Sequence, residues 1–169
     1  GFMMAFQAGG PHAQDRGLEA VAYAYEAMTS APGAATWTKP QGKHDPLVMD
    51  KKFTVVGRGV GLVIGCSTFP TWNTYPGMFA SLVTGNPVVV KPHPAGILPA
   101  AISIKIAQEV LVENGLPAHL VSMVIDEDPA KPCTMELAQR DEVRLIDFTG
   151  NTWFGDWLEN NCPQAQVYT

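Results

Sequence analysis

Val60-Gly-Leu-Val-Ile-Gly-Cys66 and Pro87-Val-Val-Val-Lys91 are the two stretches that decide the fold of this 169-residue chain. Each is a short, continuous apolar run, as expected of a strand that is buried on both faces of a sheet. Between them, residues 74–84 predict a helix that ends at Gly85. The order strand, helix, strand predicts two parallel strands joined by a right-handed crossover.

The same alternation continues to the end of the chain. The expected elements are a helix over 97–114, a strand over 120–125, a short helix over 132–140, a strand over 143–148, a helix over 152–160 and a strand over 165–168. In the long helix, Leu98, Ile102, Ile106 and Val110 recur at every fourth position, which favours one apolar face. We therefore expect an α/β fold of the Rossmann-like type, with helices on both faces of a parallel sheet.

Two segments at the start of the chain stand apart from this alternation. Residues 14–29 predict a helix with one apolar face. The residues on that face are Leu18, Val21, Ala22 and Tyr25. Residues 30–46 hold three prolines and two glycines and predict a loop. We place the boundary there, so that residues 1–46 form a helical arm and loop and residues 47–169 form the α/β domain.

The composition excludes several classes of protein. The net charge of −5 argues against a nucleic-acid or anionic membrane surface. No apolar run approaches the roughly 18–20 residues of a membrane span, and the N-terminal residues lack the basic leader of a signal peptide. Three scattered cysteines predict no disulfide framework and favour the reducing cytosol. The four histidines form no cluster, so we expect no metal site.

Ligands of parallel sheets bind beyond the carboxyl ends of the strands. The segment Phe148-Thr-Gly-Asn-Thr-Trp-Phe-Gly155 follows a strand and opens a helix, where free backbone N–H groups suit a pyrophosphate. An ordinary helix cap by Asn151 or Thr152 explains it equally well. Lys91 ends a strand and can donate to a ribose or phosphate, or can be solvated. The glycine cluster Gly57-Arg-Gly-Val-Gly61 precedes its strand and predicts a turn rather than a phosphate loop.

Three ordered motifs between residues 60 and 155 resemble the cofactor-binding domain of the aldehyde dehydrogenase superfamily. They are Cys66-Ser-Thr-Phe-Pro70, Gly85-Asn-Pro-Val-Val-Val-Lys-Pro92 and Phe148-Thr-Gly-Asn-Thr-Trp-Phe-Gly155. Their wording is most similar to the aldehyde dehydrogenase-like branch of phenylacetate degradation. The resemblance implies NADP or NAD as cofactor and a small-molecule aldehyde as substrate, oxidised to an acid or thioester. A cysteine thiolate attacks the aldehyde in this family, and a glutamate acts as base.

The resemblance also assigns roles to individual residues. Lys91 matches the lysine that binds the adenosine ribose. Gly150 and Asn151 match the pair that meets the pyrophosphate. Thr68 aligns with the asparagine that stabilises the oxyanion, and its hydroxyl can donate one hydrogen bond. Asn73 reaches the same position only if a gap is inserted, so oxyanion stabilisation in this chain is in doubt.

Pro94 bears on the choice between NAD and NADP. The resemblance puts a glutamate at this position, where it accepts hydrogen bonds from the ribose 2′ and 3′ hydroxyls. Proline removes both the charge and the acceptor, and His93 beside it can add positive charge. Lys91 can then serve a 2′-phosphate as a point charge. We therefore expect NADP to be accepted at least as well as NAD.

The departures from the family concern the catalytic groups. None of Cys66, Cys133 and Cys162 matches the nucleophile, although Cys133 lies near a predicted helix start, which can lower the pKa of a thiol. The acidic segment 126–128 is interpreted as solvated surface. We expect a truncated aldehyde dehydrogenase fold without catalytic domain, cysteine or glutamate, inactive alone and part of a cytoplasmic homo-oligomer. The alternative is a non-catalytic dinucleotide-binding module or a degenerate subunit.

Overall fold

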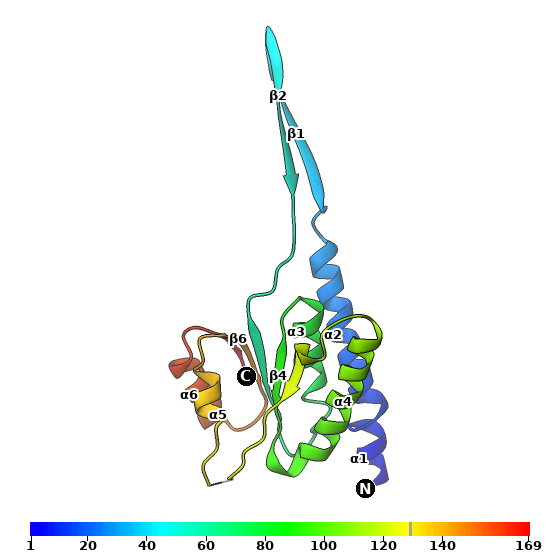
Figure 1. The fold of residues 1–169 in the computed structure, drawn as a ribbon, viewed down its shortest axis with the longest axis vertical. Helices are drawn as coiled ribbons and strands as arrows, with labels where there is room; N and C mark the ends of the chain where they lie inside the picture. Colours follow the sequence, from blue (N-terminus) through cyan, green and yellow to red (C-terminus); the bar gives the residue numbers. More distant parts are fainter. Residues whose placement is uncertain (129) are drawn as a thin grey trace.

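The computed structural model describes residues 1–128 and 130–169, and its body is a five-stranded parallel sheet between two layers of helices (Figure 1). The strand order is β5-β4-β3-β6-β7, and every pairing is parallel. The strands are β3 Val60–Ile64, β4 Val88–Lys91, β5 Val121–Met123, β6 Val143–Phe148 and β7 Gln166–Tyr168. The predicted fold class is confirmed.

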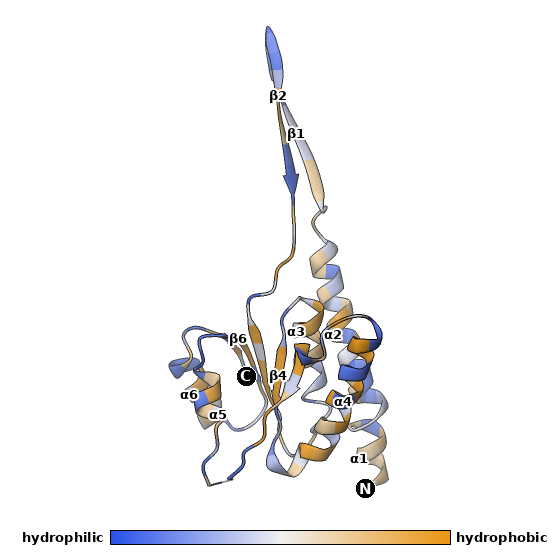
Figure 2. Ribbon diagram, viewed as in Figure 1, coloured by the Kyte–Doolittle hydropathy of each residue, from blue (hydrophilic) through white to orange (hydrophobic). Residues whose placement is uncertain are grey.

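Each face of the sheet has its own core, because successive side chains of a strand point to opposite faces. Val63 packs with Met78 of α3 and Ile104 of α4 on one face. Leu62 packs with Leu158 of α6 on the other. The helices are α3 Tyr75–Val83, α4 Ile97–Glu113, α5 Thr134–Ala138 and α6 Thr152–Asn161, with short 3₁₀ turns η1 Pro94–Gly96 and η2 Ala118–Leu120. Figure 2 shows the apolar strands between these layers.

The register of the central strands aligns their carboxyl ends. Ile64, the last residue of β3, lies beside Lys91 at the end of β4 and beside Phe148 at the end of β6. The loops that follow these three strands therefore leave the sheet at one edge. This is the edge where a ligand site is expected.

The N-terminal helices are α1 Phe2–Gln7 and α2 Pro11–Thr29, and α2 packs against α3. The predicted apolar face of α2 is wrong: Leu18 and Tyr25 are 68% and 67% exposed, whereas Ala13 and Gly17 are buried. A Cβ atom at Gly17 would lie 2.7 Å from the ring of Phe79. Small residues therefore form the contact face, since they let the two helices approach closely.

The apolar stripe predicted on α4 does not face the sheet either. Ala100 and Ile104 are the buried residues of this helix. The four stripe residues, Leu98, Ile102, Ile106 and Val110, are between 50% and 70% exposed. The helix carries two apolar faces, and periodicity alone does not say which one packs on the sheet.

The same helix has the length and composition of a membrane-spanning segment. Together with the preceding turn it covers Pro94–Glu113. The expectation that no segment approaches this length is wrong, because Lys105 and Glu109 interrupt the apolar run without making it polar on average. This is weak evidence for a span, since a helix that covers a sheet passes the same test. Ala100 and Ile104 give α4 contacts of that kind.

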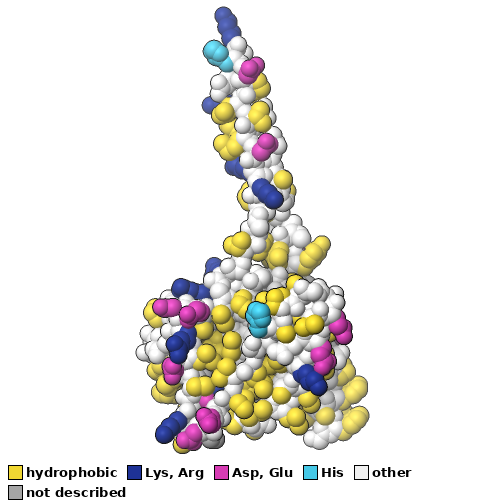
Figure 3. All heavy atoms as spheres, viewed as in Figure 1, with side chains coloured by type: hydrophobic (Ala, Val, Ile, Leu, Met, Phe, Trp, Pro, Cys, Tyr) yellow, Lys and Arg dark blue, Asp and Glu magenta, His cyan; other side chains and the backbone are white. Residues whose placement is uncertain are grey.

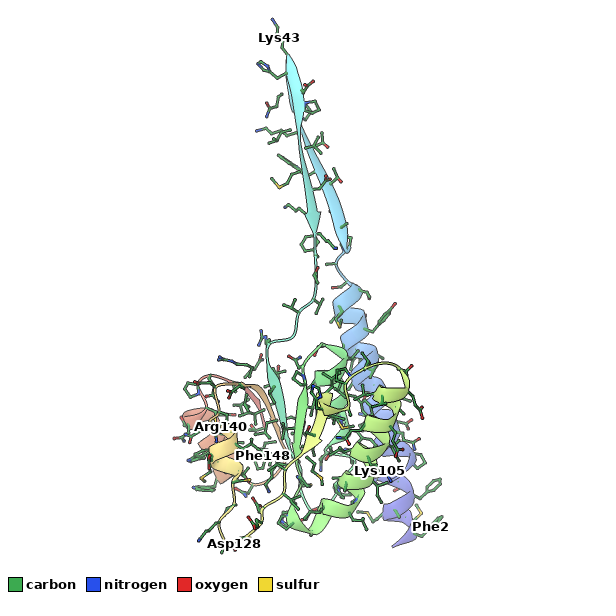
Figure 4. All side chains as sticks on the ribbon, in the orientation of Figure 1. Phe2, Lys43, Lys105, Asp128, Arg140 and Phe148 are labelled. Atoms are coloured by element: carbon green, nitrogen blue, oxygen red, sulfur yellow. The ribbon has the colours of Figure 1, made fainter. Side chains whose placement is uncertain are left out.

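An antiparallel hairpin, β1 Ala34–Gln41 and β2 His44–Lys52, projects from the body (Figure 1). Every residue of both strands is exposed, and Figure 4 shows Lys43 at its tip, far from Phe148 in the body. The loop predicted over 30–46 is therefore wrong, and the boundary proposed at residue 46 falls inside β2. Prolines are tolerated here because each strand of a two-stranded ribbon has a free edge.

Candidate functional site

A cleft of about 840 Å³ opens at the carboxyl ends of β3, β4 and β6. The residues predicted for the site all line it: Thr68, Lys91, Pro94, Gly150 and Asn151. Lys91 and the Gly150 turn thus border one cleft, as the parallel strand arrangement predicts. The cleft also contains Asp126 and Asn73, which sequence reasoning had set aside.

Lys91 is held by a buried ion pair. Its Nζ lies 2.7 Å from Oδ2 of Asp126, and the two side chains are 5% and 6% exposed. The other carboxylate oxygen accepts the backbone N–H of Cys133 at 2.9 Å. Burial raises the pKa of Asp126, but the bonds from Lys91 and Cys133 outweigh it and hold the pKa below its ordinary value. Both partners are therefore charged, and the interpretation of Asp126 as solvated surface is wrong.

The thiol of Cys133 lies against this pair. Burial, together with a hydrogen bond to Asp126 and the negative charge of that carboxylate, raises the pKa of the Cys133 thiol. The lowered pKa that a helix start suggested is therefore wrong, because the neighbouring carboxylate dominates. Burial also raises the pKa of the Cys162 thiol. Both groups are protonated at neutral pH, and all three cysteines are free thiols.

The start of α6 forms the opposite wall of the cleft. Asn151 is the N-cap, and its Oδ1 accepts the N–H of Phe154 at 2.9 Å. The N–H groups of Thr152 and Trp153 in the first turn have no partner within the helix and remain donors for a ligand. Both alternatives for this motif are therefore compatible: the side chain caps the helix, and the backbone keeps its anion-binding character.

Packing against Phe148 explains why position 150 is a glycine. A side chain at this position would overlap the ring of Phe148. Phe148 is almost fully buried and packs edge-on against Phe154. The glycine therefore allows the turn to fold over the aromatic core, whether or not a ligand approaches it.

Thr68 is an exposed residue in the lining of the cleft, and Asn73 is also part of the lining. Asn73 Nδ2 donates to Sγ of Cys66 at 2.9 Å. The amide that sequence alignment placed out of register thus faces the same cleft as Thr68. The sequence signal for it was the segment Thr71-Trp-Asn73, which directly follows the aligned motif and places Asn73 three residues beyond its end.

The two residues behind the NADP expectation are fixed by a 3₁₀ turn. His93 is the N-cap of η1, and its Nδ1 accepts the N–H of Ala95 at 3.1 Å. This contact orients the imidazole over the start of the turn. Pro94 is the first residue of η1. Because proline has no backbone N–H, its carbonyl is the only polar group it offers.

The glycine cluster at 57–61 lies at the amino end of β3, away from the cleft. The N–H groups of Arg58 and Gly59 both donate to Oδ1 of Asn86, at 2.6 and 3.3 Å. These amides are occupied by the Asn86 side chain, and the segment enters β3 through a bend at Gly59. Over the residues with described positions, no group of three or more metal-ligating side chains comes together.

The residues of the cleft fit a dinucleotide. The α6 N-terminus offers backbone donors to a pyrophosphate. The Lys91–Asp126 pair offers both a donor and an acceptor to hydroxyl groups. The cleft therefore contains separate places for the anionic and the hydroxyl-bearing parts of such a ligand.

Comparisons with protein families, protein sequences and solved structures all find aldehyde dehydrogenases. The model of the family described as "Aldehyde dehydrogenase family" matches residues 3–167. The crystal structure of an NAD-dependent aldehyde dehydrogenase from Burkholderia multivorans is 58% identical with a TM-score of 0.95, and the match covers 99% of this chain. An aldehyde dehydrogenase family 7 member A1 homolog from Caenorhabditis elegans is 37% identical over 101 residues, 57% of this chain.

These matches cover 30% of the Burkholderia chain and 18% of the Caenorhabditis relative. The glyceraldehyde-3-phosphate dehydrogenase of Methanocaldococcus jannaschii, complexed with NADP, is 19% identical with a TM-score of 0.63, over 97% of this chain and 35% of that one. At that identity the likeness concerns the fold. The chain thus spans about a third or less of the length of these relatives.

Proposed function

This chain belongs to the aldehyde dehydrogenase family, and we propose that it supplies the nucleotide-binding cleft of an enzyme that oxidises an aldehyde with NAD or NADP. The observation that carries this proposal is the single cleft shared by Lys91 and the start of α6. The Burkholderia relative is an NAD-dependent enzyme, and the Methanocaldococcus structure, which has a similar fold, is complexed with NADP. Bound nucleotide would supply the hydride acceptor for the oxidation.

The chain's own residues would hold the nucleotide rather than carry out the oxidation. The N–H groups at the start of α6 would bind the pyrophosphate, and Asn151 fixes this turn by capping it. Lys91 would donate to the adenosine ribose. Thr68 would offer one hydroxyl donor to an aldehyde oxygen at the mouth of the cleft.

The branch of the family is proposed from motif wording. Cys66-Ser-Thr-Phe-Pro70 and Lys91-Pro-His-Pro94 support a role in aromatic-acid breakdown, specifically of phenylacetate. We expect the full-length protein to prefer aromatic over short aliphatic aldehydes. Nucleotide reduction measured with matched aldehydes of both kinds tests this. A higher kcat/KM for the aliphatic series contradicts the branch but not the family.

A second proposal is that the 169 residues bind nucleotide without turning over aldehydes, as a non-catalytic module would. The raised pKa values of Cys133 and Cys162 support it, since protonated thiols are poor nucleophiles. Aldehyde-dependent nucleotide reduction by this chain that disappears in Cys133→Ser overturns the proposal. Reduction that depends on Cys66 also overturns it.

We also propose a cytoplasmic homo-oligomer. The hairpin supports oligomerisation, because a two-stranded ribbon with no core is marginal in water alone. Hydrophobic side chains lie exposed along it (Figure 3), Trp37 and Met49 among them. The three free thiols support a reducing compartment. Light scattering of the full-length protein, with and without residues 34–52, tests the first point. A monomer in both cases contradicts it.

Direct titration with NAD and NADP tests the central proposal. The wild-type protein should bind at least one of them, and Lys91→Met should weaken binding at least tenfold. Lys105→Met is the matched control, because Lys105 is an exposed lysine on α4. Circular dichroism establishes that each variant is folded. Equal effects of the two substitutions, or no binding by wild type, contradict the assignment of the cleft.

A further inference from the structure

The wall of the cleft holds a buried pair of opposite charges whose net charge is zero. Lys91 Nζ and Asp126 Oδ2 are 2.7 Å apart, and about 95% of each side chain is shielded from solvent. Lys91 also donates to the carbonyl of Pro92 at 3.4 Å. The lysine therefore faces any ligand together with a carboxylate and not as a free cation.

Among the described residues that line the cleft, no second lysine or arginine outweighs Asp126. Within the described lining of the cleft, the side chains that can carry charge are Lys91, His93 and Asp126. The Nδ1 of His93 is occupied as an acceptor. The same loop also carries two exposed acids, Glu127 and Asp128, and one exposed lysine, Lys131. The local potential around Lys91 is consequently neutral to negative.

We infer that Asp126 is a specificity-determining residue that selects an unphosphorylated ribose, and therefore NAD, over NADP. This inference rests on the proposed function, namely that the cleft binds the nucleotide with its ribose near Lys91. A ribose diol can donate to the Asp126 carboxylate and accept from the Lys91 ammonium. A 2′-phosphate is an anion without a donor at neutral pH. It meets the fixed carboxylate of Asp126 beside Lys91, which is already paired and is the only lysine or arginine in the described lining.

The inference reverses the preference expected from Pro94. That expectation assumed that the site had lost its carboxylate and that Lys91 was free to pair with a phosphate. In the structure, Asp126 supplies a carboxylate from the loop after β5 and occupies the lysine. The carboxylate that is missing at position 94 is therefore supplied by Asp126.

The experiment measures dissociation constants by calorimetry on the full-length protein. Four ligands are compared: NAD, NADP, adenosine 5′-monophosphate and adenosine 2′,5′-bisphosphate. Wild type should bind NAD at least tenfold more tightly than NADP, and the two adenosine ligands should show the same order. Asp126→Asn keeps the size and one of the two accepting oxygens but removes the charge. The substitution should reduce the ratio of the NADP to the NAD dissociation constant at least tenfold, mainly because the ligands with a 2′-phosphate bind more tightly.

Two further variants separate charge from structure. Glu127→Gln removes an exposed carboxylate from the neighbouring position and should leave the ratio within twofold of wild type. Asp126→Glu keeps the charge and should keep the discrimination. A purely structural role of Asp126 would weaken both nucleotides equally in Asp126→Asn, and that result overturns the inference.

The wild-type titration remains decisive if Asp126→Asn does not fold. Equal or tighter binding of NADP by wild type overturns the inference while leaving nucleotide binding intact. If neither nucleotide nor adenosine ligand binds wild type, the proposed function fails, and the inference fails with it. These two results are distinguishable in the first titration.

Discussion

Asp147 is a carboxylate in an apolar setting, and its removal should stabilise the protein above pH 6. It is the next-to-last residue of β6 and lies between the buried residues Ile146 and Phe148. Its side chain points toward α3, where a Cβ atom at Gly77 would overlap the carboxylate. It lines a cavity of about 580 Å³ on that face of the sheet. Among the described residues, no hydrogen bond or ion pair reaches its carboxylate.

Burial raises the pKa of Asp147 to about 6, from an ordinary value of 3.8. Because the folded-state pKa is the higher one, the neutral carboxyl group contributes stability that is fully present below pH 3.8. That contribution is lost as the pH rises through 6. A difference of this size corresponds to about 3 kcal/mol at most, since one pKa unit is roughly 1.4 kcal/mol.

Asp147→Asn should therefore unfold at higher denaturant concentration than wild type at pH 8, with a difference that shrinks toward pH 4. The assay is denaturant unfolding of both proteins at one-unit intervals between pH 4 and 8. Asp141→Asn, in the exposed turn before the same strand, controls for the loss of one charge. A variant that is less stable than wild type at pH 8 would refute the reasoning, because it would show that the carboxylate has a stabilising partner.

Three other predictions concern packing, capping and thiol chemistry. Gly17→Leu should lower the free energy of unfolding by about 1–3 kcal/mol, because the new side chain meets a ring on α3; an unchanged melting temperature would contradict the α2–α3 contact. Asn151→Ala should cost about 0.5–2 kcal/mol in denaturant unfolding, because it removes the cap of α6, whereas Asn151→Ser should retain most of it. Cys133 should react with a disulfide reagent more slowly at pH 7 than a free model thiol, and Asp126→Asn should accelerate it, since the carboxylate raises the pKa of the thiol; equal rates in both proteins would contradict this.

The central strands β3 and β4 could be predicted from the sequence because each is a continuous apolar run that is largely buried on both faces. The strand predicted over 143–148 has the bounds seen in the structure, and the one over 87–91 begins one residue early. The burial of the helices could not be predicted in the same way. In α2 the contact face is made of Ala13 and Gly17, which carry almost no hydrophobic signal, and Leu18 beside them is exposed.

The hairpin escaped prediction for a related reason. Its strands are exposed on both faces, so they lack the alternation that marks a half-buried strand. Pro32, Pro40 and Pro46 then dominate the local pattern and predict a loop. What stabilises such a ribbon is not visible in its own sequence, because it has no core of its own.

The sequence predicted where the site lies on the sheet, but it did not predict which charged groups pair there. Residues that follow parallel strands must meet at the carboxyl edge, which placed Lys91 and Gly150 in one cleft. The partner of Lys91 comes from the neighbouring strand: Val90 of β4 lies beside Met123 of β5 in the register, so the chains leaving both strands run together. Asp126 follows three residues later and folds back to reach the lysine. A lysine that ends one parallel strand and an acid that follows the adjacent one should therefore be considered as a pair before either is assigned to a ligand. In this chain that pairing changes the expected cofactor, because it converts a candidate phosphate-binding cation into half of a neutral donor–acceptor site.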